Sequence, residues 1–336
     1  MSHKHPLLAR LDGKCYTGSI WEKGKRNMKE QKAGLLRRLY MPAVLCTVLW
    51  GSAAPCIKKG YALFVIGADA PFSQLYFAGL RFALAGLLVL FTARLMGRRI
   101  LPHRDEWKPV FWICLFQSAI QYVCYYIGLS ATTGTKGAVL SGTQTFFALI
   151  FAHLALPNDK MDRRKVMGCI CGFAGVLVLG VGGLNGFHLQ GDGLVLLSAV
   201  SAGAGALVSR IYTPGRDPML LTGWQLLCGG LFLLALGWAG GGQLGMVTPG
   251  GLLLLAYLAV LSAAAFTIWT ALLGRFPVGR VSLFCFLIPV FGTLLSALVL
   301  GEQILTLRNV IALVLVSGGI AVANGGQGSK AGRGQA

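Results

Sequence analysis

Residues 132–177 read TTGTKGAVLSGTQTFFALIFAHLALPNDKMDRRKVMGCICGFAGVL, and residues 276–321, which lie 144 positions further on, read FPVGRVSLFCFLIPVFGTLLSALVLGEQILTLRNVIALVLVSGGIA. Both stretches begin with small or polar residues, continue as an apolar run, turn through a few polar residues and end in a second apolar run. Without a gap, Arg164 coincides with Arg308 and Gly175 with Gly319. Two apolar runs joined by a short polar turn predict a helical hairpin, and the chain contains this hairpin twice.

The composition indicates a membrane protein. Of the 336 residues, 55% are hydrophobic and only 12% are charged, with a mean hydropathy of +0.68. A soluble globular domain carries about 25% charged residues. Several apolar runs exceed the roughly 20 residues that span a bilayer core. We expect an all-α polytopic membrane protein with ten transmembrane helices, at residues 41–62, 72–94, 109–129, 133–156, 166–183, 192–211, 219–239, 250–273, 278–300 and 308–324.

The duplication extends upstream at the same offset, which places Gly79 on Gly223 and Gly86 on Gly230. An eight-residue insertion or deletion after the first run aligns the first pair of runs as well, with Gly51 on Gly203. The chain then consists of two five-helix repeats. Because five is an odd number, the second repeat must enter the membrane from the opposite side. Inverted repeats of this kind give two packings around a site near the bilayer midplane, and they are typical of transporters.

The predicted segments are a basic, disordered tail at residues 1–40, repeats at residues 41–183 and 190–324, and a short tail at residues 325–336. Residues 1–39 lack the apolar core and cleavage site of a signal peptide. Met28 and Met41 are alternative starts for a protein of this type, so the place of residues 1–27 in the natural protein is left open.

The net charge of +19 has a topological explanation. Lys and Arg gather in alternate connections, and the connections between them are rich in glycine. By the positive-inside rule, both termini are expected in the cytosol, with the protein in the cytoplasmic membrane. The expected partners are the bilayer and a small molecule. A nucleic-acid partner is not expected, because no basic patch alternates with aromatic residues. A homodimer is left open.

Neither a metal site nor a cofactor is expected. The nine cysteines are odd in number and contain no CxxC pair, and most lie in apolar runs, where cysteine packs as a small apolar residue. The Asp and Glu residues lie in the tail, in loops or at the ends of predicted spans, as Asp192 does, so a carboxylate proton relay is not visible. The sequence has no ATP-binding domain, which excludes a self-contained primary pump.

Three motifs resemble the drug/metabolite transporter superfamily, in its ten-helix EamA-type branch. They are Trp50-Gly51-Ser52, the Arg81–Gly86 run and Leu300-Gly301-Glu302, and the resemblance covers residues 41–324. Residues 156–159 read LPND where the first half of this family usually has Leu-Gly-Glu, which leaves the role of this turn open. The resemblance implies a central cavity and the export or exchange of small metabolites, often amino acids or drug-like compounds.

Arg81 is the first candidate site residue, because it lies about ten residues inside a predicted span. A charge there costs about 2.5–3.5 kcal/mol, so the side chain must face protein or water. It either anchors a substrate carboxylate or phosphate or bonds to helix carbonyls or a polar neighbour. Its counterpart in the second repeat is Gln225.

Polar and aromatic residues supply the other candidates. Gln117, Gln121 and Tyr125 recur every four residues and share one helix face, which either lines a cavity or packs against polar partners. The remaining substrate-binding candidates are Trp50, Gln144 and Trp269, and Trp224 is a further wall candidate, although Trp is also enriched at bilayer interfaces. Pro55 and Pro289 interrupt helical hydrogen bonds and are candidate hinges.

These features favour a secondary transporter and not an enzyme, and the resemblance implies that it exports or exchanges small metabolites such as amino acids or drug-like compounds. An alternative within transport is movement of lipid-linked substrates or nucleotide sugars, which related branches perform. An alternative of another class is a membrane-embedded transferase, which would need acid, base or metal ligands at one membrane depth. The sequence contains no such cluster.

Overall fold

The computed structural model describes residues 36–132, 140–180, 188–300 and 307–324, together with Gly34 and Gly137. Within these residues every regular element is a helix and no β-strand occurs. The chain divides into two units, Met1–Met41 and Pro42–Ala336, and all of the packing below lies within the second unit.

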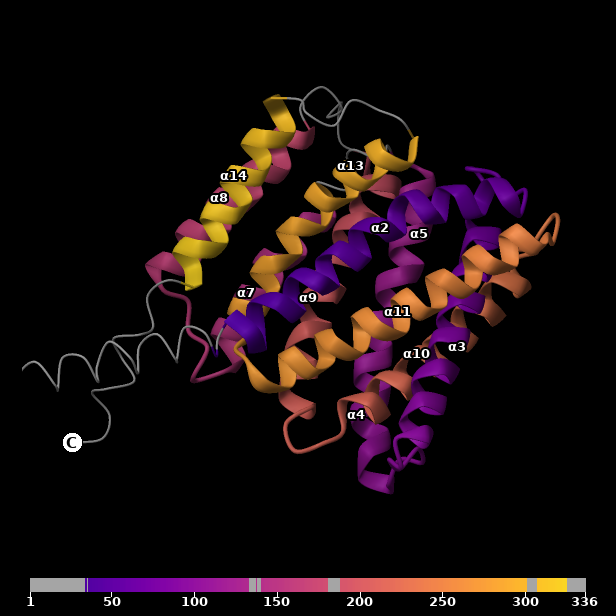
Figure 1. The fold of residues 1–336 in the computed structure, drawn as a ribbon, viewed down its shortest axis with the longest axis horizontal. Coiled ribbons are helices and arrows are strands. Elements are labelled where there is room, and N and C mark those ends of the chain that lie inside the picture. Colours follow the sequence, from indigo (N-terminus) through magenta and orange to yellow (C-terminus); the bar gives the residue numbers. More distant parts are fainter. Residues whose placement is uncertain are drawn as a thin grey trace, which may run out of the picture. The chain divides into compact units, whose positions relative to one another are not determined.

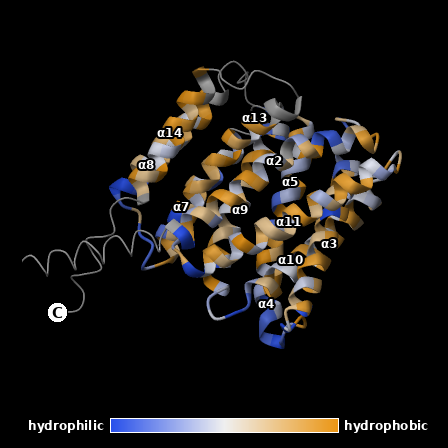
Figure 2. Ribbon diagram, viewed as in Figure 1, coloured by the Kyte–Doolittle hydropathy of each residue, from blue (hydrophilic) through white to orange (hydrophobic). Residues whose placement is uncertain are grey.

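Helices lie on the predicted apolar runs, and Figure 1 shows their course. Six helical stretches are long and apolar enough to cross a membrane: Arg37–Leu63, Pro71–Leu95, Arg104–Ser130, Leu189–Tyr212, Pro218–Ala239 and Pro249–Arg275. Figure 2 shows apolar residues along the helices and hydrophilic colour at the start of α4 and of α8. The bounds are α2 Met41–Leu63, α3 Pro71–Leu95, α4 Trp107–Cys114, α5 Gln121–Ser130, α7 Gln144–Ala155, α8 Arg163–Gly180, α9 Leu194–Tyr212, α10 Pro218–Ala239, α11 Pro249–Arg275, α13 Leu287–Leu300 and α14 Leu307–Asn324.

Irregular helix occurs inside two predicted spans and at the start of a third, where the π-helical segment η4 (Leu189–Gly193) leads into α9. A π-helical segment, η3 (Leu115–Ile120), joins α4 to α5. The run predicted at residues 278–300 consists of α12 (Val278–Val281), the 3₁₀ segment η5 (Ser282–Phe286) and α13. Apolar periodicity reports burial and does not distinguish these hydrogen-bond patterns, so the sequence did not predict the changes. π-Helical and 3₁₀ segments inside long helices often accompany functional sites.

Helices α3 and α10 pack along each other (Figure 1), and glycines bring their backbones together. A Cβ added at Gly79 would lie 2.8 Å from the carbonyl oxygen of Gly230, and one added at Gly86 would lie 2.7 Å from that of Gly223. These approaches leave no room for a side chain, which is the known role of small residues between membrane helices. Gly79 and Gly223 are equivalent at the 144-residue offset, and so are Gly86 and Gly230. Replacing each glycine by its equivalent therefore turns one contact into the other.

A second pair of equivalent contacts involves helices of both halves. A Cβ at Gly51 in α2 would lie 2.7 Å from the Cβ of Phe291 in α13, and one at Gly203 in α9 would lie 2.7 Å from the Cβ of Phe147 in α7. Figure 1 also shows α8 and α14 side by side. Helices α8 and α14 are counterparts at the 144-residue offset, as α3 and α10 are. Each of these four helices therefore packs against its own equivalent from the other half.

The connection between α7 and α8 contains a buried ion pair. Lys165 Nζ lies 2.6 Å from Asp159 Oδ1, and their side chains are 7% and 4% exposed. The second carboxylate oxygen of Asp159 accepts a hydrogen bond of 3.0 Å from the backbone N–H of Gly279 in α12. The turn that departs from the family pattern therefore ties α12 to the α7–α8 connection, and Asp159 supplies the carboxylate.

Candidate functional site

A cavity of about 250 Å³ lies among α2, α3, η3, α5, α7, α9, α11 and η5. Every residue proposed from the sequence as substrate-binding lines it: Trp50, Arg81, Gln117, Gln121, Tyr125, Gln144 and Trp269. These residues come from five separate stretches of the chain. The fold therefore brings together side chains that were each predicted separately, from the polar residues of single spans.

Arg81 is the central charge of the cavity. Its side chain extends from the middle of α3, and the residue is only 5% exposed. The guanidinium carbon lies 4.2 Å from the centroid of the Phe82 ring. The buried Nε and Nη1 atoms have no hydrogen-bond partner, so the bonds to helix carbonyls that were considered as an alternative are not made by these two atoms. A buried cation without acceptors is costly, and an anion that enters the cavity would relieve this cost.

Aromatic rings form one wall. Trp50 packs edge-on against Trp269 at a centroid distance of 5.1 Å and against Phe266 at 5.4 Å. The ring centroid of Tyr122 lies 4.5 Å from that of Phe82, and the Phe82 ring is the one beside Arg81. The indole Nε1–H of Trp50 is buried and donates to no protein acceptor. This wall offers flat apolar surface together with one free donor, an arrangement that suits a ring-bearing ligand.

The amides have different surroundings. Gln117, in the π-helical segment, is 5% exposed, and its Oε1 accepts a hydrogen bond of 3.2 Å from Gln225 Nε2. Gln121 and Gln144 are partly exposed and line the cavity. Gln117 is therefore partly held by a neighbouring helix, whereas the other two remain available to a ligand.

The two halves contribute different chemistry to the lining. Arginine, the three glutamines and three tyrosines all come from residues 41–183, and residues 190–324 supply small, hydroxyl-bearing and apolar side chains. Asp, Glu, Lys and His are absent from the described lining. Arg81 is accordingly the one charged group among the cavity residues that the structure describes.

Sequence reasoning missed several lining residues, although the repeat register points to some of them. Adding 144 to Tyr122, Ser141 and Gln144 gives Phe266, Cys285 and Ile288, and all six side chains line the cavity. Other lining residues, such as Tyr126, Ser198 and Ser282, carry no signal of this kind that would separate them from packing residues.

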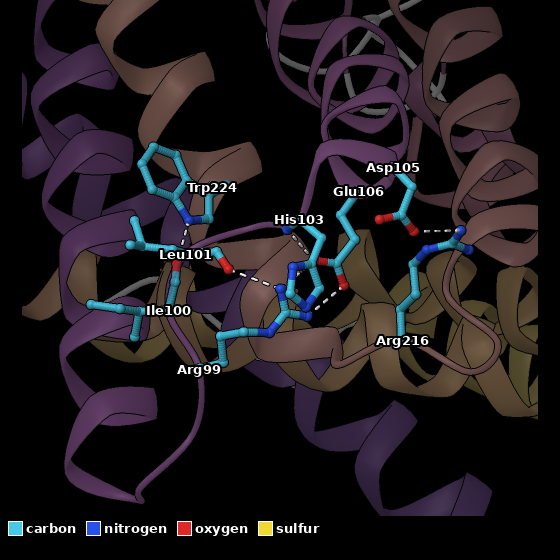
Figure 3. Close-up of polar contacts among 8 residues, drawn as sticks. All are labelled: Arg99, Ile100, Leu101, His103, Asp105, Glu106, Arg216 and Trp224. Carbon is cyan, nitrogen blue, oxygen red and sulfur yellow. Dashed lines mark hydrogen bonds and ion pairs between the residues drawn. The ribbon is translucent and has the colours of Figure 1, made fainter.

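Trp224 is the further wall candidate, for which a place at the bilayer interface is the alternative, and its contacts favour the alternative. Trp224 does not line the cavity: its Nε1 donates a hydrogen bond of 2.7 Å to the carbonyl oxygen of Ile100 (Figure 3). Its ring packs edge-on against Trp107 at 5.0 Å. The indole anchors the α3–α4 connection to α10, a role in keeping with the interfacial preference of tryptophan.

The same connection is rich in polar contacts (Figure 3). Arg99 binds both carboxylate oxygens of Glu106, at 2.7 and 2.8 Å, and this hydrogen bonding raises the pKa of the Arg99 guanidinium. Arg98 pairs with Asp217 at 3.0 Å, and Arg216 lies 4.0 Å from Asp105. Residues 96–106 thus contact the connection between α9 and α10.

The candidate hinges lie in different helical contexts. Pro55 is inside α2, which continues through it to Leu63. Pro289 is the third residue of α13 and follows the 3₁₀ segment η5. Proline is tolerated in the first turn of a helix, where its missing N–H needs no partner. The irregular geometry of this span therefore lies before Pro289.

Comparisons with known proteins agree with this architecture. The family model of the EamA-like transporter family matches residues 38–181 and 189–325. A solved crystal structure of a protein shares the fold, with a TM-score of 0.71, 22% identity and coverage of 84% of this chain and 95% of that one.

Two curated relatives illustrate the family. A WAT1-related chloroplastic protein of Arabidopsis thaliana is 27% identical, over 79% of this chain and 64% of the relative, so this chain spans less than two thirds of that protein. A protein of Salmonella typhimurium named "Probable amino-acid metabolite efflux pump" is 28% identical, over 82% of this chain and 91% of its own.

The family match covers most of the chain, and it falls on apolar helices that surround a cavity with polar lining. The chain is thus a multi-pass membrane protein and a small-molecule transporter that belongs to the EamA-like transporter family, within the drug/metabolite transporter superfamily.

Proposed function

We propose that this protein is a secondary transporter that exports or exchanges small metabolites by alternating access. Residues 41–183 and 190–324 would act as two inverted five-helix repeats around the cavity at Arg81. The observation that carries this proposal is the exchange of contacts between α3 and α10. Gly79 approaches the backbone of Gly230 as Gly86 approaches that of Gly223, which is the relation expected at a two-fold axis between the repeats.

Contacts between connections support the inverted orientation. The loop after α3 contacts the loop before α10 through Arg98 and Asp217. The loop after α10 contacts the loop before α3, because Gly245 N donates to Phe64 O at 2.9 Å. It also contacts the first turn of α3, because Gln243 N donates to Ser73 Oγ at 3.2 Å. Equivalent loops of the two halves thus lie at opposite ends of α3, a helix of 25 residues.

This symmetry gives a physical basis for alternating access. Two inverted repeats of similar structure exchange their conformations, so a state open to one side has a counterpart of similar energy open to the other. The cavity lies between the halves and is lined by both. Rocking of one half against the other would therefore expose the same residues to each side in turn.

The chemistry of the cavity supports a small metabolite as substrate. A cavity of about 250 Å³ is below the usual range of about 300–1,000 Å³ for pockets that hold drug-sized ligands, which favours a small metabolite over a nucleotide sugar. The name of the Salmonella relative describes efflux of amino-acid metabolites, which supports export. We also propose insertion in the cytoplasmic membrane with both termini in the cytosol, from the distribution of Lys and Arg.

The proposal is tested by profiling metabolites inside and outside cells with and without the protein. A transported compound should change its distribution, and the purified protein in proteoliposomes should exchange it by counterflow. An unchanged metabolite profile together with absent counterflow for all compounds tested would reject transport.

The topology is tested separately with single cysteines in a cysteine-free background. Asp69→Cys, in the loop before α3, and Arg104→Cys, after α3, should react with a membrane-impermeant reagent from opposite sides. Gln243→Cys should share the side of Asp69→Cys, and Arg216→Cys that of Arg104→Cys. Labelling of Gln243→Cys and Arg104→Cys from one side would reject the inverted arrangement.

A further inference from the structure

We infer that the cavity selects small aromatic carboxylates carried as net monoanions, with Arg81 binding the carboxylate and the aromatic wall holding the ring. This inference rests on the proposed transport function and adds the charge and chemical class of the substrate.

The sign of the charge follows from Arg81. The residue is only 5% exposed, and its Nε and Nη1 atoms have no hydrogen-bond partner. Arg98, Arg99, Lys165 and Arg216 form ion pairs with carboxylates, and all four lie outside the cavity lining. Because the described lining contains no Asp or Glu, the neutralising charge must come with the ligand.

The number of charges follows from the same lining. One guanidinium balances one negative charge, and its planar fork of N–H donors matches the two oxygens of a carboxylate. A phosphate monoester carries about −1.5 to −2 at neutral pH. It would bring excess negative charge into a low-dielectric site that offers only neutral groups besides Arg81. A carboxylate therefore fits this cavity better than a phosphate.

The ring follows from the wall. Trp50 packs edge-on against Trp269 and against Phe266, with ring-centroid distances of 5.1 and 5.4 Å, and Tyr122 adds a ring beside Phe82. Aromatic surfaces bind aromatic ligands through burial and through edge-to-face contacts. Since the cavity holds about 250 Å³, there is room for a single small ring system together with its acid group.

The lining also disfavours an α-ammonium group. An amino-acid zwitterion would satisfy Arg81 through its carboxylate but would bury its ammonium among neutral amide, phenol and hydroxyl oxygens. A buried charge without an opposite partner is costly. An amine without a carboxylate would be worse still, because it would add a second positive charge beside Arg81. Deaminated aromatic acids should therefore bind better than the corresponding amino acids.

The test measures binding to the purified protein in lipid nanodiscs by isothermal titration calorimetry. Each probe carries one benzene ring, and the series differs in charge: 4-hydroxybenzoate (anion), 4-hydroxybenzamide (neutral), tyrosine (zwitterion), tyramine (cation) and phenyl phosphate (dianion). We expect 4-hydroxybenzoate to bind at least about tenfold more tightly than each of the others, the size of one charge-assisted contact.

Variants locate the selectivity. In Arg81→Gln the affinity ratio of 4-hydroxybenzoate to 4-hydroxybenzamide should fall to about one, and Arg81→Lys should keep part of the preference because it keeps the charge. Arg98→Gln, which removes a cation outside the cavity, is the matched control and should keep the wild-type ratio. The wild-type probe series needs no variant, so the test does not depend on Arg81→Gln folding.

The outcomes separate this inference from the proposed function. Tighter binding of tyrosine, tyramine, the amide or the phosphate would overturn it, as would the absence of binding by all five probes. In either case transport itself is decided by the metabolite profile and counterflow. A selectivity that persists in Arg81→Gln would also overturn the assignment of the carboxylate to this residue.

Discussion

Helices α3 and α10 occupy equivalent places in the two halves, yet the residues at one matched position have opposite roles. Arg81 in α3 lines the cavity and leaves two nitrogens without partners. Gln225, 144 residues later in α10, is fully buried, lies outside the lining and donates to Gln117. The glycines around these residues keep the same contacts in both helices. Packing of the backbone thus maintains the symmetry, whereas the cavity lining departs from it.

The largest effect is expected when the symmetric contact itself is broken. A Cβ at Gly230 would lie 2.7 Å from the carbonyl carbon of Phe82, and backbone cannot move aside as a side chain can. Gly230→Leu should therefore abolish the folded, monodisperse protein in detergent, measured by size-exclusion chromatography. Gly250→Ala is the control, since a Cβ there meets nothing within 4 Å. Normal yield of Gly230→Leu would contradict this packing.

The next effect concerns the charge. Arg81→Gln gives α3 the residue of α10 and should lower counterflow of an anionic substrate by at least about tenfold, and Arg81→Ala should abolish it. Both variants should insert normally, because removing an unpaired buried cation relieves a cost. Counterflow and membrane yield are measured together, and full transport by a well-expressed Arg81→Ala would remove the residue from the site.

Exchanging the two residues sharpens the comparison. The double variant Arg81→Gln/Gln225→Arg has the same composition as the wild type, but position 225 does not line the cavity. Transport should not recover, and the melting temperature should fall because the new cation is buried beside Gln117 and Ser118, which are neutral. Recovery of counterflow would show that the two positions are interchangeable.

A smaller effect is expected from the hydrogen bond between the halves. Gln225→Leu leaves Gln117 Oε1 without its protein donor and should destabilise the protein by about 1–3 kcal/mol. Adding Gln117→Leu removes the orphaned acceptor. The double variant should therefore lose less unfolding free energy than the sum of the losses in the two single variants. Thermal unfolding of the four proteins measures this coupling, and strict additivity would show that the bond contributes nothing.

The smallest effect is expected at the loops. Arg98 and Asp217 form a partly exposed ion pair of 3.0 Å, with side chains 42% and 28% exposed. Pairs of this kind contribute less than about 1 kcal/mol. Arg98→Gln should therefore leave counterflow unchanged and barely shift the melting temperature at moderate salt. A large loss of counterflow in Arg98→Gln would show that the contact between the α3–α4 and α9–α10 connections is needed for transport.

Much of the candidate site was accessible from the sequence, because polar groups inside apolar spans are conspicuous. A charge at Arg81 or a row of amides at Gln117 and Gln121 must avoid lipid, so the chemistry of these residues singles them out. Trp224 shows the limit of this reasoning. An indole in a span has several acceptable surroundings, and only its hydrogen bond to Ile100 O decided between them.

The sequence by itself determined the membrane class, the positions of the helices and the internal repeat, because hydropathy and periodicity depend on neighbours along the chain. The tertiary structure decided that five separate stretches meet at one cavity and that Arg81 has no counter-charge there. It also decided that Gln225 turns toward Gln117. These outcomes depend on which helix covers each face, and that is set by close packing between residues far apart in the sequence.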